Sequence, residues 1–165
     1  MYIPGEALLP HKQYHLEQAL KIRALFEKVT AGEGISAEWR QEESELPNIS
    51  QNVIKSAHAA DLVILGQANE DKDDANIREV AGDVLMECGR PVLLVPYSGT
   101  FAEIGYHILV GWNGSWESAR AVFDALPFLK SVNQVHLHWA ALVQPDSEEK
   151  IILGADLAAT LADMM

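Results

Sequence analysis

Apolar residues recur along the chain with two different periods, one typical of helices and the other typical of strands. Spacing of three or four residues predicts helices, and short apolar runs predict strands of a parallel sheet. The predicted helices are residues 11–31, 48–59, 76–88, 116–129 and 151–165. The predicted strands are residues 35–40, 61–66, 92–95, 107–112 and 132–139. Because strands and helices alternate, the pattern predicts an α/β fold with a mainly parallel sheet.

The first predicted helix is expected to be amphipathic and to end at a glycine pair. Gly32 and Gly34 supply the C-terminal stop. Residues 35–40 then alternate between apolar and polar side chains, which is typical of a half-buried strand. The apolar positions of the helix are Leu16, Leu20, Ile22, Ala24, Leu25, Phe26 and Val29.

A segment rich in proline and glycine, residues 96–106, predicts a linker between two halves, residues 1–95 and 107–165. In the second half, Asn113 and Gly114 predict a turn, and Ser115 is the expected N-cap of the helix that follows. The two halves are expected to form one folded unit.

Composition and charge exclude several classes of protein. A hydrophobic content of 48% excludes a largely disordered chain. Twelve basic against 24 acidic residues give a net charge of −12, which disfavours nucleic acids and anionic membrane surfaces as partners. Cys88 is the single cysteine, so no disulfide forms within the chain, and a reducing compartment is expected. With no apolar run long enough to cross a bilayer, we expect a cytoplasmic protein.

Two sets of segments together resemble the universal stress protein family. Residues 58–66, 80–85 and 90–96 resemble its fourth strand, fourth helix and fifth strand. Residues 108–115 and 117–127 resemble the first strand and first helix of its tandem bacterial members. The resemblance implies a three-layer sandwich of the adenine nucleotide alpha hydrolase-like type. The back half of one domain precedes the front half of another, so the chain resembles the middle of a tandem protein.

This order leaves two arrangements open. The halves can form one permuted sheet, with residues 107–112 and 132–139 beside residues 61–66, or two chains can exchange halves. The linker reaches roughly 36 Å when extended, which is enough to return along one strand and cross two strand spacings. Both halves also carry a helix suited to the family's second-helix position. The surplus helix, if exposed, favours pairing with another chain, and we therefore expect a homodimer.

The resemblance also places a nucleotide loop after residues 61–66, but this chain departs from the family's glycine-rich pattern. Gly66 and Gln67 begin the loop, Asn69 replaces its second glycine, and Arg78 and Glu79 replace its terminal Gly-Ser pair. Residues 70–74 add a net charge of −3 where a triphosphate would lie, which opposes binding. ATP or AMP stays an alternative ligand.

The adenine-side motif is altered as well, because the family's aspartate corresponds to Asn113, which keeps an oxygen acceptor but lacks the charge. Trp112 and Trp116 flank this turn and can either stack on a planar ligand or pack against a partner subunit. Arg78 can hold an anion or pair with Asp74 or Glu79. The candidate ligand-binding residues are Gly66, Gln67, Asn69, Arg78, Glu79, Trp112, Asn113, Gly114 and Ser115.

Other residues favour structural roles over catalysis. His136 and His138 share one face of a predicted strand, from which both could bind a metal ion. Because no Cys, Asp or Glu lies nearby at ligand spacing, we expect solvated strand histidines and no metal site. Ser115 lacks the context of a nucleophile, and Cys88 is expected to be buried. We therefore expect a non-enzymatic protein of the stress response, without catalytic residues or a metal, that acts by oligomerising and by binding protein partners or a small ligand. The alternatives are an ATP- or AMP-binding member with weak ATP hydrolysis and a truncated remnant of a tandem protein.

Overall fold

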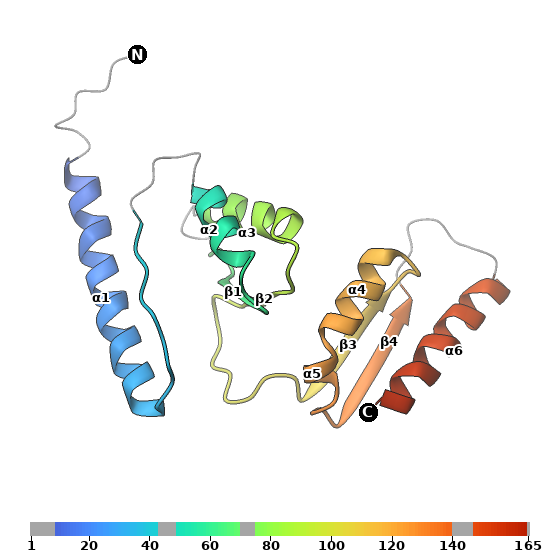
Figure 1. Ribbon diagram of the computed structural model, residues 1–165. Coiled ribbons are helices and arrows are strands. Elements are labelled where there is room, and N and C mark those ends of the chain that lie inside the picture. The colour runs from blue at the N-terminus through green and yellow to red at the C-terminus, as the bar shows by residue number, and fades with distance from the viewer. Residues whose placement is uncertain (1–8, 43–48, 70–74, 140–146, 165) are drawn as a thin grey trace, which may run out of the picture. The chain divides into compact units, whose positions relative to one another are not determined.

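The computed structural model describes residues 9–42, 49–69, 75–139 and 147–164, and the chain divides into two compact units (Figure 1). The first unit comprises residues 1–44 and the second comprises residues 45–165. The predicted linker, residues 96–106, lies inside the second unit and forms neither helix nor strand. The division of the chain at that linker stays a prediction.

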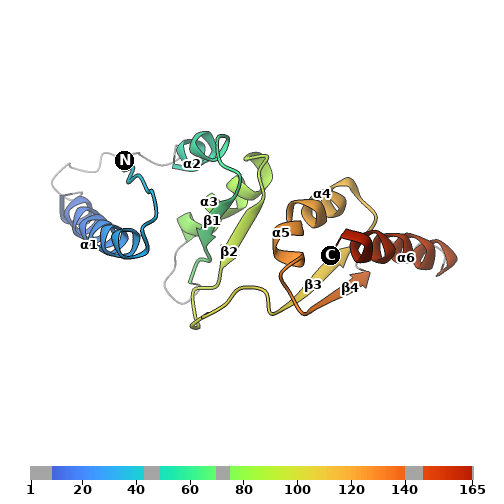
Figure 2. The same ribbon diagram turned by 60° about the horizontal axis from the view of Figure 1, so that its bottom comes forward.

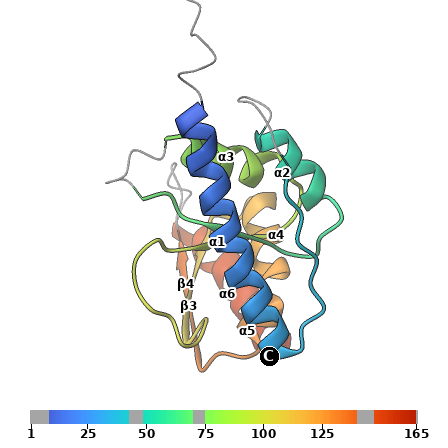
Figure 3. The same cartoon turned by 90° about the vertical axis from the view of Figure 1, so that its left-hand side faces the viewer.

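The first unit consists of one long helix, α1 (Leu9–Glu33), and a chain segment that returns beside it (Figure 3). The helix ends because Gly34 takes a left-handed conformation, with φ of 64°, and the amide of Ile35 donates to the carbonyl of Thr30 at 3.2 Å. The ring of Trp39 in the returning segment packs on Phe26, with 5.5 Å between ring centroids. This ring contact fixes the returning segment to one side of α1.

The predicted strand at residues 35–40 is wrong, because this segment is extended but pairs with no described strand. The predicted one-sided amphipathicity of α1 also needs correction. At 100° per residue, Leu20 points roughly opposite to Ile22 and Leu25, and all three side chains are exposed. A spacing of three or four residues alone does not show that the apolar positions share one face.

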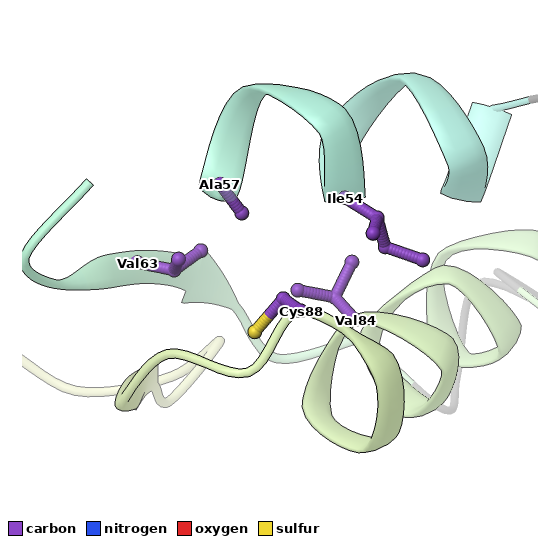
Figure 4. Packing of buried hydrophobic residues seen from close by; sticks show 5 residues of the cluster. All are labelled: Ile54, Ala57, Val63, Val84 and Cys88. Atoms are coloured by element: carbon purple, nitrogen blue, oxygen red, sulfur yellow. The ribbon is translucent and has the colours of Figure 1, made fainter. Parts of the chain in front are cut away.

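The second unit begins with α2 (Ile49–Ala57), β1 (Val63–Gly66), α3 (Ala75–Glu87) and β2 (Val92–Val95). β1 and β2 are parallel, with Val63 opposite Val92 and Gly66 opposite Val95. The two helices pack against one face of this strand pair. Their buried contacts form the first core, shown in Figure 4, which consists of Ile54, Ala57, Val63, Val84 and Cys88.

The second unit continues with β3 (His107–Trp112), α4 (Trp116–Asp124), α5 (Leu126–Leu129), β4 (Gln134–Trp139) and α6 (Ser147–Met164). β3 and β4 are also parallel, and α4 and α6 lie on the same side of them (Figure 2). The core on that side consists of Val110, Val122, Leu129, Leu157 and Leu161.

Each strand pair therefore buries one face and leaves the other open. On the outer faces Ile64 is 61% exposed and Leu109 is 70% exposed. Parallel sheets in proteins are normally covered on both faces, because their strands are apolar on both sides. The open faces are thus unusual for this type of sheet.

The predicted α/β class with parallel strands is confirmed, but the strands form two two-stranded sheets, β1–β2 and β3–β4, in the part of the chain that the structure describes. The single permuted sheet, one of the two arrangements that the sequence leaves open, is not what the structure shows. Each pair is held by its own helices, and its core is separate from the other core. The three-layer sandwich stays a prediction.

Three predicted helices match the structure to within two residues at each end, and the other two differ by more. The helix predicted over residues 116–129 is broken into α4 and α5 at Ala125, because Pro127 has no amide to donate and its ring is incompatible with a continuing helix. α6 begins at Ser147 rather than at Ile151, and residues 140–146 before it lie outside the described residues. No helix among the described residues is both long enough and apolar enough to cross a membrane.

Candidate functional site

The turn between β3 and α4 holds three of the predicted ligand-binding residues, and local hydrogen bonds occupy two of them. The side-chain oxygen of Asn113 accepts the amide of Ser115 at 3.0 Å. Gly114 between them has φ of 76°, a left-handed conformation that glycine adopts without strain. Asn113 is therefore a turn-forming residue here, because asparagine side chains in turns commonly accept a hydrogen bond from the backbone amide two residues later.

Ser115 is the N-cap of α4, which confirms the sequence prediction. Its hydroxyl oxygen accepts the amide of Ser118 at 3.3 Å, and the Ser118 hydroxyl donates to the Ser115 carbonyl at 2.9 Å. A hydrogen bond with the Ser115 side chain, followed by one with its own amide, lowers the pKa of the Glu117 carboxyl. The positive end of this helix thus already has a carboxylate beside it, which disfavours a second anion there.

Trp112 ends β3 and lies opposite Trp139, which ends β4. Both side chains are partly buried, and neither indole N–H has a hydrogen-bond acceptor among the described residues. An unsatisfied buried donor costs roughly 1–3 kcal/mol, so this edge of the sheet has two donors in need of an acceptor. Trp139 is not among the residues predicted from the sequence, although both predicted strands end in a tryptophan. Trp116 is exposed at the start of α4.

The second set of predicted residues follows β1. Gly66 is exposed, and the amide of Gln67 donates to the carbonyl of Val95 at 2.8 Å, which extends the β1–β2 ladder by one bond. Ala68 is buried and Asn69 is half-buried. A Cβ added at Gly66 would have no atom within 4 Å, so the backbone here is open on its outer side.

Arg78 and Glu79 lie near the start of α3 and are exposed. Neither forms an ion pair with another residue that the structure describes. The acidic run at residues 70–74 and the proposed pairing of Arg78 with Asp74 lie outside the described residues. The effect of that charge on a phosphate therefore stays a prediction.

The structure does not bring these two sets together in one sheet. The permuted sheet would place Gly66 and Asn113 at the carboxyl ends of neighbouring strands. In the structure Gly66 ends a strand of one sheet and Asn113 follows a strand of the other. No hydrogen bond joins the two sheets among the described strands, so the residues form two separate candidate sites.

The second unit also has an open groove of about 550 Å³ that the sequence analysis did not predict. Leu85, Met86 and Trp116, which are large exposed apolar residues, contribute to its lining. Its two arginines are engaged with backbone oxygens: Arg90 donates to the carbonyl of His58 at 2.7 Å, and Arg120 donates to the carbonyl of Gly89. The groove therefore presents mainly apolar surface.

The remaining candidates have the structural positions that the sequence predicts. His136 and His138 are exposed and share the outer face of β4. Cys88 is buried and its thiol lies 3.4 Å from the carbonyl oxygen of Arg90. Within the described ranges, no group of three or more His, Cys, Asp or Glu side chains is arranged to hold a metal ion.

Comparisons of the chain with models of protein families, with curated proteins and with solved structures found no match.

Proposed function

We propose that this chain is a non-enzymatic, cytoplasmic protein of the universal stress type that acts by forming a homodimer and by binding protein partners or a small ligand. The proposal combines the sequence resemblance with one structural observation, the amount of apolar surface left open. Large apolar side chains are exposed on the outer face of each strand pair and along α1. Large exposed apolar patches are typical of proteins that bind other proteins.

The turn after β3 supports a binding role over a catalytic one. Asn113 and Ser115, which the resemblance places beside an adenine, use their side-chain oxygens in the turn and in the cap of α4. The Glu117 carboxylate at the same helix terminus opposes a phosphate.

The homodimer is tested by light scattering on the purified protein at micromolar concentration. We expect a mass of about twice 18.2 kDa. A mass of one chain at every micromolar concentration tested would contradict the dimer. The exposed apolar surface would then lack the partner proposed for it.

The ligand is tested by calorimetric titration with ATP and with AMP, each with and without Mg²⁺, after removal of co-purified nucleotide. We expect no saturable binding, because the loop after β1 lacks the glycines that let amides approach phosphates. The triple variant Asn69→Gly, Arg78→Gly, Glu79→Ser restores the second glycine and the terminal Gly-Ser pair and is expected to gain ATP binding.

A matched variant, Glu103→Ser, removes one exposed acid outside the loop and is expected to gain nothing. Micromolar binding of ATP or AMP by the wild-type chain would overturn the degenerate-loop argument and favour the nucleotide-binding alternative.

A further inference from the structure

The exposed side of α1 carries a short heptad pattern that specifies both a partner and an orientation. Ile22, Leu25 and Val29 are 57%, 61% and 52% exposed and recur at intervals of three and four residues. Numbered as a heptad, Ile22 and Val29 occupy position a and Leu25 occupies position d. A β-branched residue at a with leucine at d is the combination that favours two parallel helices.

The chain's own returning segment does not cover this side. Trp39 packs on Phe26, which lies at position e, at the flank of the stripe. The apolar stripe itself remains exposed beside this contact. A single helix with one segment beside it cannot bury such a stripe alone, so another surface must cover it.

The charges beside the stripe agree with a second copy of the same helix. In a parallel pair, position g of one helix faces position e of the next heptad on its partner. That geometry places Lys28 opposite Glu33 of the second copy, twice in each symmetric pair. Neither residue has an ion-pair partner within the described part of its own chain.

The antiparallel alternative is disfavoured by the same residues. There, positions g of both helices face each other, so Lys21 and Lys28 of the two copies would meet. Like charges brought together in this way are destabilising, and such repulsion is how natural helix pairs select one orientation.

We propose that α1 pairs in parallel with α1 of a second copy through Ile22, Leu25 and Val29, flanked by Lys28–Glu33 ion pairs between the copies. This inference rests on the homodimer of the proposed function and assigns part of its interface. The apolar stripe covers two helical turns, and stable coiled coils need three or four heptads. The α1 pair is therefore one part of the dimer contact.

The first experiment compares two equally exposed leucines on opposite sides of α1 in the full chain. Leu25→Glu places a charge in the stripe and is expected to weaken dimerisation at least tenfold, as measured by sedimentation over a dilution series. Leu20 is 66% exposed on the other side, so Leu20→Glu is the matched control, expected within twofold of wild type. Circular dichroism verifies that both variants keep their helix content.

The second experiment exchanges charges. Lys28→Glu and Glu33→Lys each place like charges across the pair and are expected to weaken the homodimer several-fold. An equimolar mixture of the two variants restores both opposite-charge contacts, so we expect a heterodimer with nearly wild-type affinity.

The outcomes separate this inference from the function on which it rests. A wild-type dimer that Leu25→Glu leaves intact would overturn the α1 pair and keep the homodimer. A wild-type monomer would overturn both. If Leu25→Glu lowers the free energy of unfolding but not the dimer affinity, α1 packs within its own chain and the inference fails. Mixed charge variants that do not form a heterodimer would contradict the parallel orientation.

Discussion

At the scale of single residues, the turn from Asn113 to Ser118 shows how polar side chains that resemble a ligand site can serve the fold. The oxygen of Asn113 closes the turn, and the hydroxyl of Ser115 accepts an amide that would otherwise lack a partner at the start of α4. Both contacts join residues two or three positions apart in the sequence, so they do not depend on distant parts of the chain. The stability of α4 therefore depends on these two side chains.

Replacing the cap tests this role. Ser115→Ala removes the acceptor of the Ser118 amide and is expected to lower the free energy of unfolding by about 1 kcal/mol in urea titrations. Ser131→Ala removes an exposed hydroxyl that donates to the Phe128 carbonyl and is the control, with an expected loss below about 0.5 kcal/mol. Equal losses in the two variants would argue against the cap.

The lowered pKa of Glu117 predicts a pH dependence of the same helix terminus. Its ordinary value is 4.5, and the hydrogen bond with Ser115 stabilises the charged form in the folded state. Because the unfolded carboxyl binds its proton first as the pH falls, the stabilisation is present above about 4.5 and is lost below it. Wild type is therefore expected to be more stable than Glu117→Gln at pH 7, and this difference should shrink by pH 3.

The pH experiment is repeated in a Ser115→Ala background, where the main cause of the shift is gone. We expect the Glu117→Gln substitution to change the free energy of unfolding at pH 7 by less in that background than in wild type. A difference that does not change with pH in wild type would show that the carboxylate is not stabilised at this position.

At the scale of elements, each strand pair depends on helices that cover only one of its faces. Leu129 of α5 is 1% exposed and joins α4, α6 and the β3–β4 pair in one core. Its position follows from the break at Ala125, where Pro127 prevents a continuous helix and α5 begins. The short helix α5 therefore has a structural function in this core.

Truncation of this side chain tests the packing. Leu129→Ala is expected to lower the free energy of unfolding by about 3 kcal/mol, since a fully buried leucine leaves a cavity. Leu85→Ala, at a site 54% exposed, is expected to cost less than about 0.5 kcal/mol in the same denaturation experiment. A small effect at Leu129 would mean that the core closes over the vacancy or is not formed.

At the scale of the whole molecule, the second unit has two cores, which can unfold together or separately. An isolated two-stranded parallel sheet with one covered face is only marginally stable. We therefore expect the two halves of this unit to unfold together, as the sequence analysis predicts.

The tryptophans make this prediction measurable. In a Trp39→Phe background, the remaining three tryptophans all lie between residues 112 and 139. Val84→Ala perturbs only the other core and is expected to cost about 2 kcal/mol, so it should shift the fluorescence transition of these tryptophans. A shift seen by circular dichroism but not by fluorescence would show that the halves unfold separately.

Much of the secondary structure was predictable because its signals are local. The strand at residues 92–95 and the cap at Ser115 match the predictions, since a proline boundary and a serine before a helix act on their immediate neighbours. The strand predicted at residues 35–40 failed because a strand requires a partner. Trp139 was missed because its importance comes from lying opposite Trp112.

The sequence by itself determined the α/β class, the parallel character of the strands and the positions of most helices, because apolar periodicity and turn residues act over a few positions. Only the tertiary structure decided which strands pair and which faces remain open. Strand pairing and burial depend on segments distant in sequence, and the same apolar pattern fits one sheet or two. The exposed stripe of α1 shows this clearly, since the spacing of its apolar residues is written in the sequence but their exposure is not.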